Sequence, residues 1–439
     1  MKVAIIGSGP TGLLLGAALA DRGHDVATVD RDPGPRADGG WRRRGVMQFE
    51  HAHGFRPQVG RALARHWPEG LAAWRSAGAE PIVLDVPGLG EVAAGHRSRR
   101  STFERGLRVA AGDVAGLELR TGHVDRILEE GGRAVGVQVD GARVEADLVV
   151  DASGRSGLAR HAADGRLEGL CGMAYVDRTF RLRAGAEPGP MDNPVALVRE
   201  YDGYQVLVFL HERRHFSVLF VRPTADDDLK DLRHTAAFDA ACAAVPDLAA
   251  WTDPALAAPT SPVLVGGALR NTYRPQRGLP GLVTVGDAVA TTTPTRGRGI
   301  AMAYTQAEAL LGLLDDGADA ATVAEPFGAW CDTQIRPWVD DHIAIDTEAV
   351  ARWQGADVDL ARPLTSDAVC VAAEVDPRIA GIAGPFFAME ALPAVLAEAE
   401  PLARAVYATG WRRPLPAGPT RDELVDVVRR ALAGARARG

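Results

Sequence analysis

Short apolar runs alternate with longer helical segments at the start of the chain. Residues 3–6 read Val-Ala-Ile-Ile, which predicts a buried strand, and residues 13–22 have the composition and length of a helix. Residues 25–30 form a second apolar run, which ends at the carboxylate of Asp30. The pattern therefore predicts a strand, a turn, a helix and a second strand, the unit from which parallel sheets are built.

This pattern continues to residue 151. It predicts helices over residues 58–66 and 97–108, strands over residues 117–121 and 148–151, and a hairpin with strands at residues 134–140 and 143–146. Gly141 lies in the turn of that hairpin. Together these elements fit a parallel sheet that is extended by an antiparallel crossover.

From residue 172 to residue 223 the apolar period changes to two. Apolar and polar residues alternate over four segments, residues 175–183, 195–200, 204–211 and 216–222. This period is typical of an antiparallel sheet with one buried face. We therefore predict a sheet that is inserted into the first domain.

The chain then returns to its first pattern. Residues 281–288 predict a buried strand that ends in Gly-Asp, and residues 300–314 predict a helix. Beyond residue 325 the chain is helical, and the last helix, residues 421–435, has one apolar stripe made of Leu424, Val427, Val428 and Leu432. The stripe favours a helix packed on its own domain over one that binds a membrane or a partner.

Composition narrows the class of protein. The formal net charge of −8 argues against binding to nucleic acid. The four cysteines (Cys171, Cys242, Cys331 and Cys370) lack the spacing of a zinc site or a disulfide framework. No apolar stretch is long enough to span a bilayer, and the first strand follows Met1-Lys2 without room for a signal peptide. We expect a soluble, cytoplasmic protein without a metal, and the sequence leaves its oligomeric state open.

Gly7-Ser8-Gly9-Pro10-Thr11-Gly12 fills the turn between the first strand and the first helix. In such a turn the first glycine permits the tight bend, the second lets the backbone approach a pyrophosphate, and the third lets helix and strand pack closely. The N–H groups at the helix start then face the phosphates, and Asp30 is placed to accept hydrogen bonds from ribose hydroxyls. With strand, helix and terminal acid in register, the motif predicts a dinucleotide site.

A later strand end repeats this logic. Asp287 ends the strand, Pro294 interrupts the loop that follows, and Gly297-Arg298-Gly299 opens the next helix. A carboxylate in this place can hold a polyol hydroxyl, while helix N–H groups meet an anion or an electron-rich ring edge. An ordinary strand–turn–helix has the same features, so this motif indicates a cofactor site only in combination with the glycine motif at residues 7–12.

The segment from residue 41 to residue 53 is rich in groups that can bind or react. It holds three consecutive arginines, Arg42 to Arg44, and the pair His51 and His53. Arginine-rich loops are usually solvated, and a histidine in such a loop is more often structural than catalytic. Because the segment follows the nucleotide loop, a functional interpretation and a structural one both stay open.

Three motifs now occur together within residues 1–345. They are the glycine motif with Asp30, the segment Asp151-Ala152-Ser153-Gly154-Arg155, and Gly286-Asp287 with Pro294 and Gly297 to Gly299. In this combination the chain resembles the FAD-dependent monooxygenases of the p-hydroxybenzoate hydroxylase superfamily. The resemblance implies an α/β fold: a glutathione-reductase-type, Rossmann-like FAD domain with an inserted antiparallel β-sheet substrate domain and a helical C-terminal part.

The resemblance also implies domain boundaries. A discontinuous FAD-binding domain would comprise residues 1–70, 95–170 and 275–345. The β-sheet substrate domain would comprise residues 71–94 and 171–274, and residues 346–439 would form the helical C-terminal region.

For the adenosine and phosphate end of FAD, the resemblance assigns residues from the first half of the chain. It implies that Asp30, with Arg31 beside it, holds the ribose, and that the pyrophosphate is cradled by Gly7, Gly9 and Gly12. Arg100 resembles the family arginine that reaches the phosphates, and Val124 stands where a backbone group meets adenine.

For the flavin end, the resemblance assigns mostly later residues. Asp287 would hold the ribityl chain, and Pro294 with the loop from Gly297 to Gly299 would line the isoalloxazine. His53 and His51 are the candidates for groups near the reacting ring. Arg44 is the candidate for binding an anionic substrate or the nicotinamide phosphate.

The implied activity is hydroxylation or epoxidation of a small aromatic, polyketide-like or alkene substrate by dioxygen, through a flavin C4a-hydroperoxide. The electrons would come from NADPH or NADH, or from a separate flavin reductase. Two alternatives share the cofactor motifs: a reductase or dehydrogenase of the geranylgeranyl-reductase kind, and a non-catalytic flavoprotein.

The chain departs from the family pattern near the expected flavin. Residues 45–53 are similar to Gly-Val-Pro-Gln-Gly-Arg-His-Ala-His, but Met47, Phe49 and Glu50 replace the proline, the second glycine and the arginine. We therefore expect a reshaped pocket there. Asp151-Ala152 replaces an Asp-Gly dipeptide that the family associates with FAD and NADPH. The Trp-x-Trp-x-Ile-Pro motif of flavin halogenases is absent, which disfavours halogenation.

Overall fold

The computed structural model describes residues 1–38, 40–43, 45–86, 90–156, 158, 166–267 and 269–437, and the chain divides into two compact units. Unit 1 comprises Met1–Gly169 and Arg270–Val339, and unit 2 comprises Leu170–Leu269 and Asp340–Gly439. Residues 71–94, which we expected beside the antiparallel sheet, lie in unit 1, and the C-terminal helices share unit 2 with that sheet. The roles of these segments stay predictions.

Unit 1 is built on a parallel sheet with β1 (Lys2–Ile6) at its centre. Within the described residues the strand order is β18 (Leu282–Thr284), β9 (Leu148–Asp151), β1, β2 (Asp25–Asp30) and β5 (Leu117–Thr121). The chain moves from β1 to one side and later returns to the other. Ligands of open parallel sheets bind at the carboxyl edge, where the strand order reverses in this way.

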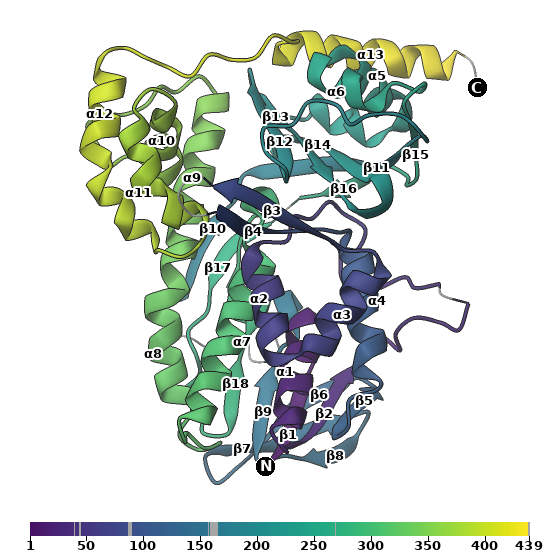
Figure 1. Ribbon diagram of the computed structural model, residues 1–439, viewed down its shortest axis with the longest axis vertical. Helices are drawn as coiled ribbons and strands as arrows, with labels where there is room; N and C mark the ends of the chain where they lie inside the picture. Colours follow the sequence, from purple (N-terminus) through teal and green to yellow (C-terminus); the bar gives the residue numbers. More distant parts are fainter. Residues whose placement is uncertain are drawn as a thin grey trace. The chain divides into compact units, whose positions relative to one another are not determined.

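Helix α1 (Pro10–Asp21) joins β1 to β2 and is buried on nearly all sides. Its sequence PTGLLLGAALAD is apolar around the whole helix, which is typical of a helix enclosed by other elements. It packs against α2 (Pro57–His66), α4 (Arg100–Ala111) and α7 (Gly299–Asp315). Figure 1 shows α1 in front of the parallel strands.

The remaining elements of unit 1 surround this sheet. An antiparallel sheet comprises β6 (Val124–Glu130), β7 (Arg133–Val139) and β8 (Ala142–Glu145), and a hairpin comprises β3 (Glu80–Val86) and β4 (Gly90–Arg97). Short strands β10 (Leu167–Leu170), β17 (Arg270–Tyr273) and β19 (Ala290–Thr291) also pair. The other helices are α3 (Pro68–Ala77), α8 (Ala324–Gln334) and α9 (Arg336–Trp353), which continues into unit 2.

Unit 2 contains the antiparallel sheet that the period of two predicts. Its strands are β12 (Ala196–Tyr201), β13 (Tyr204–Leu210), β14 (His215–Pro223), β11 (Met173–Leu182) and β15 (Ala257–Pro259), and β16 (Leu264–Gly266) also pairs with β11. The four strands predicted between residues 175 and 222 are confirmed with their ends shifted by one or two residues.

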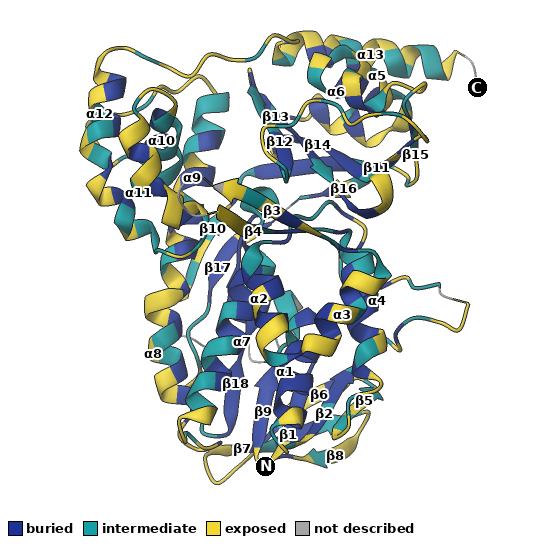
Figure 2. Ribbon diagram, viewed as in Figure 1, coloured by how far each residue is buried: buried dark blue, intermediate teal, exposed yellow. Residues whose placement is uncertain are grey.

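Helices cover one face of this sheet. They are α5 (Thr235–Ala244), α6 (Pro246–Thr252) and α13 (Arg421–Arg436), and they share a core with the sheet that includes Phe216, Phe220 and Trp251. Leu424 and Val428 of α13 are buried in this core, so the last helix packs on its own unit as predicted. In Figure 2 the outer face of α13 is mostly exposed. Among the helices of the described chain, none combines the length and apolarity needed to cross a membrane.

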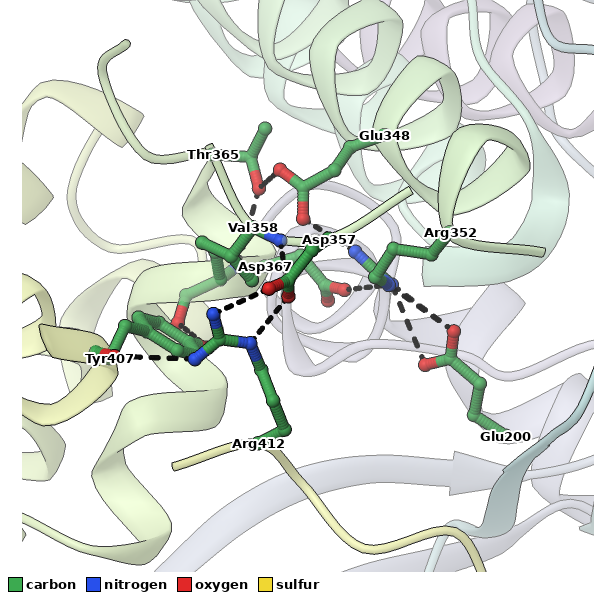
Figure 3. Close-up of polar contacts among 10 residues, drawn as sticks. Glu200, Glu348, Arg352, Asp357, Val358, Thr365, Asp367, Tyr407 and Arg412 are labelled. Atoms are coloured by element: carbon green, nitrogen blue, oxygen red, sulfur yellow. Dashed lines mark hydrogen bonds and ion pairs between the residues drawn. The ribbon is translucent and has the colours of Figure 1, made fainter. Parts of the chain in front are cut away.

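The C-terminal helices α10 (Ser366–Val371), α11 (Pro377–Phe387) and α12 (Glu400–Ala408) complete unit 2. Arg352, on α9, joins three elements by ion pairs, to Glu200 of β12, Glu348 of α9 and Asp367 of α10 (Figure 3). The predicted α/β architecture, with an antiparallel sheet in the middle of the sequence, is confirmed.

Two local expectations need correction. The helix that we predicted from residue 97 begins at Arg100, because Arg97 is the last residue of β4. The sequence pattern also contains no sign of the β3–β4 hairpin. Ile82 and His96 of the hairpin are buried, but the apolar residues Val83 and Val92 are exposed, so polar and apolar residues do not alternate along it.

Candidate functional site

The carboxyl ends of the parallel strands are aligned at one edge of unit 1. Asp151, the last residue of β9, pairs with Ile6 of β1 on one side and with Thr284 of β18 on the other. Val29 of β2 pairs with Ile6. The three motifs found in the sequence therefore leave the sheet at the same level, although they are distant in the chain.

Gly7 and Gly12 hold the first turn tightly against its surroundings. Gly7 has φ +103°, and a Cβ there would lie 2.7 Å from the carbonyl oxygen of Ala152. A Cβ at Gly12 would lie 2.0 Å from the carbonyl oxygen of Gly7. Both positions exclude any side chain, so the turn, the start of α1 and the end of β9 can pack directly on one another.

Gly9 has the opposite surroundings. A Cβ at Gly9 would find no atom within 4 Å, so open space lies over the start of α1. The N-terminus of α1 has no side-chain cap and no acidic residue in its first turn. The first N–H groups of a helix have no partner within the helix and attract anions. This cradle fits a pyrophosphate, as expected for FAD.

Asp30, at the end of β2, is held in a fixed orientation. Its Oδ2 accepts hydrogen bonds from the backbone N–H of Ser8, at 2.9 Å, and from Arg43 Nη2, at 2.7 Å. Its Oδ1 accepts from the backbone N–H of Asp32, at 2.9 Å. A carboxylate has about four lone-pair positions, so one stays available for a ribose hydroxyl.

Arg43 connects Asp30 to helix α4. Its guanidinium forms ion pairs with Asp30 and with Glu104, and Glu104 also pairs with Arg100, whose Nε lies 2.5 Å from Oε1. The side chains of Arg43 and Glu104 are only 6% and 1% exposed. Burial lowers the pKa of Arg43, but the carboxylates of Glu104 and Asp30 outweigh that effect and raise it above its usual value.

His53 belongs to the same network. Arg100 Nη1 lies 3.2 Å from Gln48 Oε1 and 3.3 Å from His53 Nε2, and His53 Nδ1 lies 3.1 Å from the carbonyl oxygen of His51. Because a guanidinium can only donate, His53 Nε2 accepts this hydrogen bond and Nδ1 donates to His51. The contacts therefore fit a neutral imidazole with its proton on Nδ1.

The late motif meets the early ones at Asp287, in the short helix η4 (Gly286–Ala288). Burial raises the pKa of Asp287 above its usual range, and the charges of Arg100, Arg155 and Arg274 oppose that shift. Arg155 belongs to the motif after β9 and Arg100 to helix α4, so charges from two earlier parts of the chain lie near this carboxyl group. A Cβ at the preceding Gly286 would lie 3.4 Å from Thr11 Oγ1, at the start of α1.

The glycine loop before α7 carries positive charge. Pro294 starts the short helix η5 (Pro294–Arg296), Gly297 has φ +60°, and Gly299 is the first residue of α7. Arg56 Nη2 donates a hydrogen bond to the carbonyl oxygen of Arg296, at 2.7 Å. Burial and the charges of Arg298 and Arg296 lower the pKa of Arg56 to about 10. This loop therefore favours an anionic ligand.

The roles of the remaining predicted site residues stay predictions, and one of these residues lies outside the described part of the chain. Arg31 is exposed, and its guanidinium lies against Gly45, where a Cβ would be 2.9 Å from Nη2. Val124 is buried at the start of β6. Arg44 is not among the described residues. In the described part of the chain, no cluster of three or more acidic, histidine or cysteine side chains is placed to hold a metal ion.

Sequence reasoning missed Arg43, Glu104 and Gln48 as parts of this network. Arg43 was one of three consecutive arginines, and nothing local distinguishes the one that is buried. For Glu104 a signal did exist, because Arg100 and Glu104 are four residues apart and therefore share one face of a helix.

Two family models match the chain. A model described as FAD binding domain matches residues 1–49, and a model described as tryptophan halogenase matches residues 85–344, more than half of the chain. The chain belongs to the tryptophan halogenase family. It is an FAD-dependent oxidoreductase, as the resemblance implied. Membership of this family corrects one expectation: the missing tryptophan motif does not remove halogenation from the candidate reactions of this chain.

One short stretch of the chain is similar in sequence to a characterised enzyme subunit. The NAD-dependent dihydropyrimidine dehydrogenase subunit PreT of Escherichia coli (strain K12) is 46% identical over 48 residues, which are 11% of this chain and 11% of that protein. The match spans only this small part of PreT.

Solved structures match over most of the chain. The flavin-dependent brominase Bmp2 is 16% identical with a TM-score of 0.55, and the match covers 100% of both chains. PqsL of P. aeruginosa, in complex with 2-aminobenzoylacetate, is 16% identical with a TM-score of 0.59, over 81% of this chain and 100% of that one. The 2-methyl-3-hydroxypyridine-5-carboxylic acid oxygenase is 16% identical with a TM-score of 0.56, over 82% and 94%. At these identities the likeness shows the fold alone.

Proposed function

We propose that this chain is an FAD-dependent monooxygenase that hydroxylates or epoxidises a small aromatic, polyketide-like or alkene substrate with dioxygen. FAD, when bound, supplies two-electron transfer and oxygen activation. The observation that supports the proposal best is the meeting of three motifs at one sheet edge, marked by Gly7, Arg155 and Asp287. These are the motifs in which the chain resembles the hydroxylases.

Each part of the edge has a task under this proposal. The open start of α1 at Gly9 binds the pyrophosphate, and Asp30 accepts a hydrogen bond from the ribose. Arg100 lies between the Asp30 network and Asp287, and it contributes positive charge along the cofactor. The protein therefore orients an extended dinucleotide by fixed charges and backbone N–H groups.

His53 is the candidate for contact with the reacting groups. It accepts from Arg100 through Nε2, so it presents a neutral imidazole on the loop beside the network. When a phenol takes the place of Arg100 at Nε2, the neutral imidazole can accept its proton, which increases the electron density of an aromatic ring before oxygen transfer. The positive loop around Arg56 and Arg298 favours substrates that carry an anionic group.

Halogenation is the second candidate, and the tryptophan halogenase match over residues 85–344 favours it. Both reactions require FAD, a source of electrons and dioxygen. They differ in the acceptor of the electrophilic oxygen, which is an organic substrate in the first and a halide ion in the second. The absent Trp-x-Trp-x-Ile-Pro motif favours the organic substrate.

The test supplies purified protein with FAD, candidate phenols and alkenes, and ¹⁸O₂, with and without bromide. NADPH or NADH reduces the flavin in one arm, and a separate flavin reductase does so in the other. We expect a product that has gained one ¹⁸O atom in both halide conditions. A brominated product would support the second candidate and overturn the first.

Two other outcomes decide between the remaining alternatives. Product formation that is undiminished without oxygen would identify a reductase of the geranylgeranyl-reductase kind. A protein that binds FAD but is neither reduced by NAD(P)H or the reductase nor reoxidised in air would be a non-catalytic flavoprotein. Either result would overturn both oxygen-dependent proposals.

A further inference from the structure

Helix α4 presents three charged residues on one face, at intervals of four. They are Arg100, Glu104 and Arg108, and residues four apart lie one above the other on a helix. The first two join the network that leads from His53 through Arg43 to Asp30. The third, Arg108, takes no part in the hydrogen bonds of that network, although it lies on the same face.

Arg108 lies against the loop that follows β2. The loop places Gly34 so close that a Cβ there would be 2.9 Å from Arg108 Nε, and Gly34 has φ +90°. The backbone conformation favours glycine at this position, and a side chain there would displace the guanidinium. The contact places Arg108 beside Gly34, which is four residues beyond Asp30 in the chain, at the end of the site expected to hold adenosine.

The guanidinium of Arg108 has an unsatisfied donor. The residue is 8% exposed, and within the described chain Nη1 is buried without a hydrogen-bond partner. The nearby carboxylates have other donors: Asp30 binds Ser8 and Arg43, and Asp32 Oδ1 accepts from Gly34 N and Trp41 Nε1, both at 2.8 Å. A buried charged donor without a hydrogen-bond partner costs free energy. A ligand that supplies an acceptor atom at Nη1 would remove this cost.

Electrostatics agrees with this placement. Burial lowers the pKa of Arg108 below its usual value, with a further lowering by Arg43, while Asp30 and Asp32 act in the opposite direction. The guanidinium stays protonated at neutral pH, because arginine is not deprotonated in proteins. It can therefore only donate, and its ligand must offer an oxygen or nitrogen acceptor.

We infer that Arg108 is a positioning residue for the adenosine half of FAD, donating from Nη1 to an acceptor on the ribose or the adenine ring. The inference rests on the proposed function, because it takes FAD as the ligand at the end of β2. The face of α4 that carries Arg100, Glu104 and Arg108 would then follow the dinucleotide, with Arg100 near Asp287 and Arg108 near Asp30.

The test compares two flavins, because FMN lacks the adenosine half that Arg108 would hold. Apoprotein is titrated with FAD, FMN and ADP by flavin fluorescence and calorimetry. For Arg108→Met we expect the Kd of FAD and of ADP to rise about 10- to 100-fold, as for the loss of a hydrogen bond to a charged group. The Kd of FMN should stay within about twofold of the wild-type value.

Two variants guard against a general loss of structure. Arg108→Lys keeps the charge but not the planar fork. It should therefore weaken FAD binding less than Arg108→Met does, and it should leave FMN binding unchanged. Arg143→Met removes an exposed arginine on β8 and should change neither flavin. Equal weakening of FAD and FMN in Arg108→Met would overturn the inference, because it would show a structural role.

The outcomes also separate this inference from the proposed function. Unchanged FAD binding in Arg108→Met, with normal binding in the wild type, would overturn the inference alone. Failure of the wild-type protein to bind FAD would overturn both. The readout is binding to the apoprotein, so it is independent of which acceptor receives the oxygen.

Discussion

Gly9 and Gly12 show that two glycines of one motif can be required for different reasons. Gly12 has a carbonyl oxygen 2.0 Å from the position of a Cβ, whereas Gly9 has no atom within 4 Å. Gly12 therefore serves the packing of the polypeptide itself. Gly9 serves something that the polypeptide does not supply, which we propose to be the pyrophosphate of FAD.

This contrast predicts opposite phenotypes for two alanine variants. Gly12→Ala should destabilise the apoprotein by several kcal/mol, because backbone must move to remove the clash, on the order of other overpacking substitutions. Gly9→Ala should change the free energy of unfolding by no more than about 1 kcal/mol. It should nevertheless weaken FAD binding at least about tenfold, as its methyl group occupies the cradle.

Urea unfolding of the apoproteins and FAD titration measure the two effects. Wild-type affinity in a stable Gly9→Ala variant would show that the open space over α1 is not the pyrophosphate site. A stable, FAD-binding Gly12→Ala variant would show that the turn can relax.

His53 can be separated from FAD binding by a substitution that keeps a polar group. If it accepts a proton from substrate, His53→Gln should lower turnover about 100-fold or more, because positioned general bases contribute factors of this size. The Kd of FAD should stay within about twofold, since Arg100 keeps its contacts with Glu104 and Gln48. Rapid-mixing kinetics and FAD titration of the same preparation check both parts. Unchanged turnover would restrict His53 to a structural role.

At this scale the sequence predicts residues at element ends better than residues that meet across the fold. Asp30 could be named because it ends a recognisable strand, and Asp287 because it closely follows one. Arg43 and Glu104 are 61 positions apart, and their pairing arises only when the loop after β2 folds onto α4. The proposed roles of all these residues stay predictions until ligands are tested.

At the scale of the element, α4 depends on a carboxylate between two arginines. Glu104 is almost fully buried and balances Arg43 and Arg100. Removing its charge would leave two cations close together in a poorly solvated place, which is more costly than losing an exposed ion pair.

We therefore predict that Glu104→Gln destabilises the protein by about 3 kcal/mol. The matched control is Glu118→Gln on β5, where Glu118 and Arg120 are 56% and 40% exposed and their pair is worth about 0–1 kcal/mol. Urea unfolding at pH 7 gives both values. Equal losses in the two variants would mean that burial does not govern the strength of the α4 network.

Elements were predictable where a continuous apolar run or an alternation of polar and apolar residues marks them, as in β1, α1 and the strands of unit 2. The β3–β4 hairpin has neither pattern, because Val83 and Val92 are apolar but 49% and 38% exposed. Gly95 of β4 has a further constraint, because a Cβ there would lie 2.0 Å from the carbonyl oxygen of Phe55. That contact joins distant segments, so no local pattern announces it.

At the scale of the whole molecule, each unit is assembled from two separated stretches of chain, and ion pairs join those stretches within unit 2. Arg352 connects the C-terminal part to β12 through Glu200 (Figure 3). Arg421, at the start of α13, binds both oxygens of Asp226, with Nε and Nη2 at 2.8 and 2.9 Å. The chain segments 170–269 and 340–439 are therefore held by charges as well as by the apolar core.

The pair formed by Asp226 and Arg421 makes the stability of unit 2 dependent on pH. Burial would raise the pKa of Asp226, but its hydrogen bonds from Arg421 and the backbone of Leu229 outweigh that effect and lower it below the usual value. A carboxyl group with a lower pKa in the folded state stabilises the fold above its unfolded pKa, about 4, and this contribution is lost as the pH falls through the folded value.

Asp226→Asn should therefore cost about 2 kcal/mol at pH 7, the size of a hydrogen bond to a charged group. The difference from the wild type should shrink as the pH falls below about 4, because the wild-type carboxylate is then protonated as well. Asp422→Asn, which removes an exposed partner of the same arginine, should change little at any pH. Unfolding by urea between pH 3 and pH 7, followed by tryptophan fluorescence, measures these differences. A deficit of Asp226→Asn that stayed constant over this range would show that α13 is held by its apolar stripe and not by the charge of Asp226.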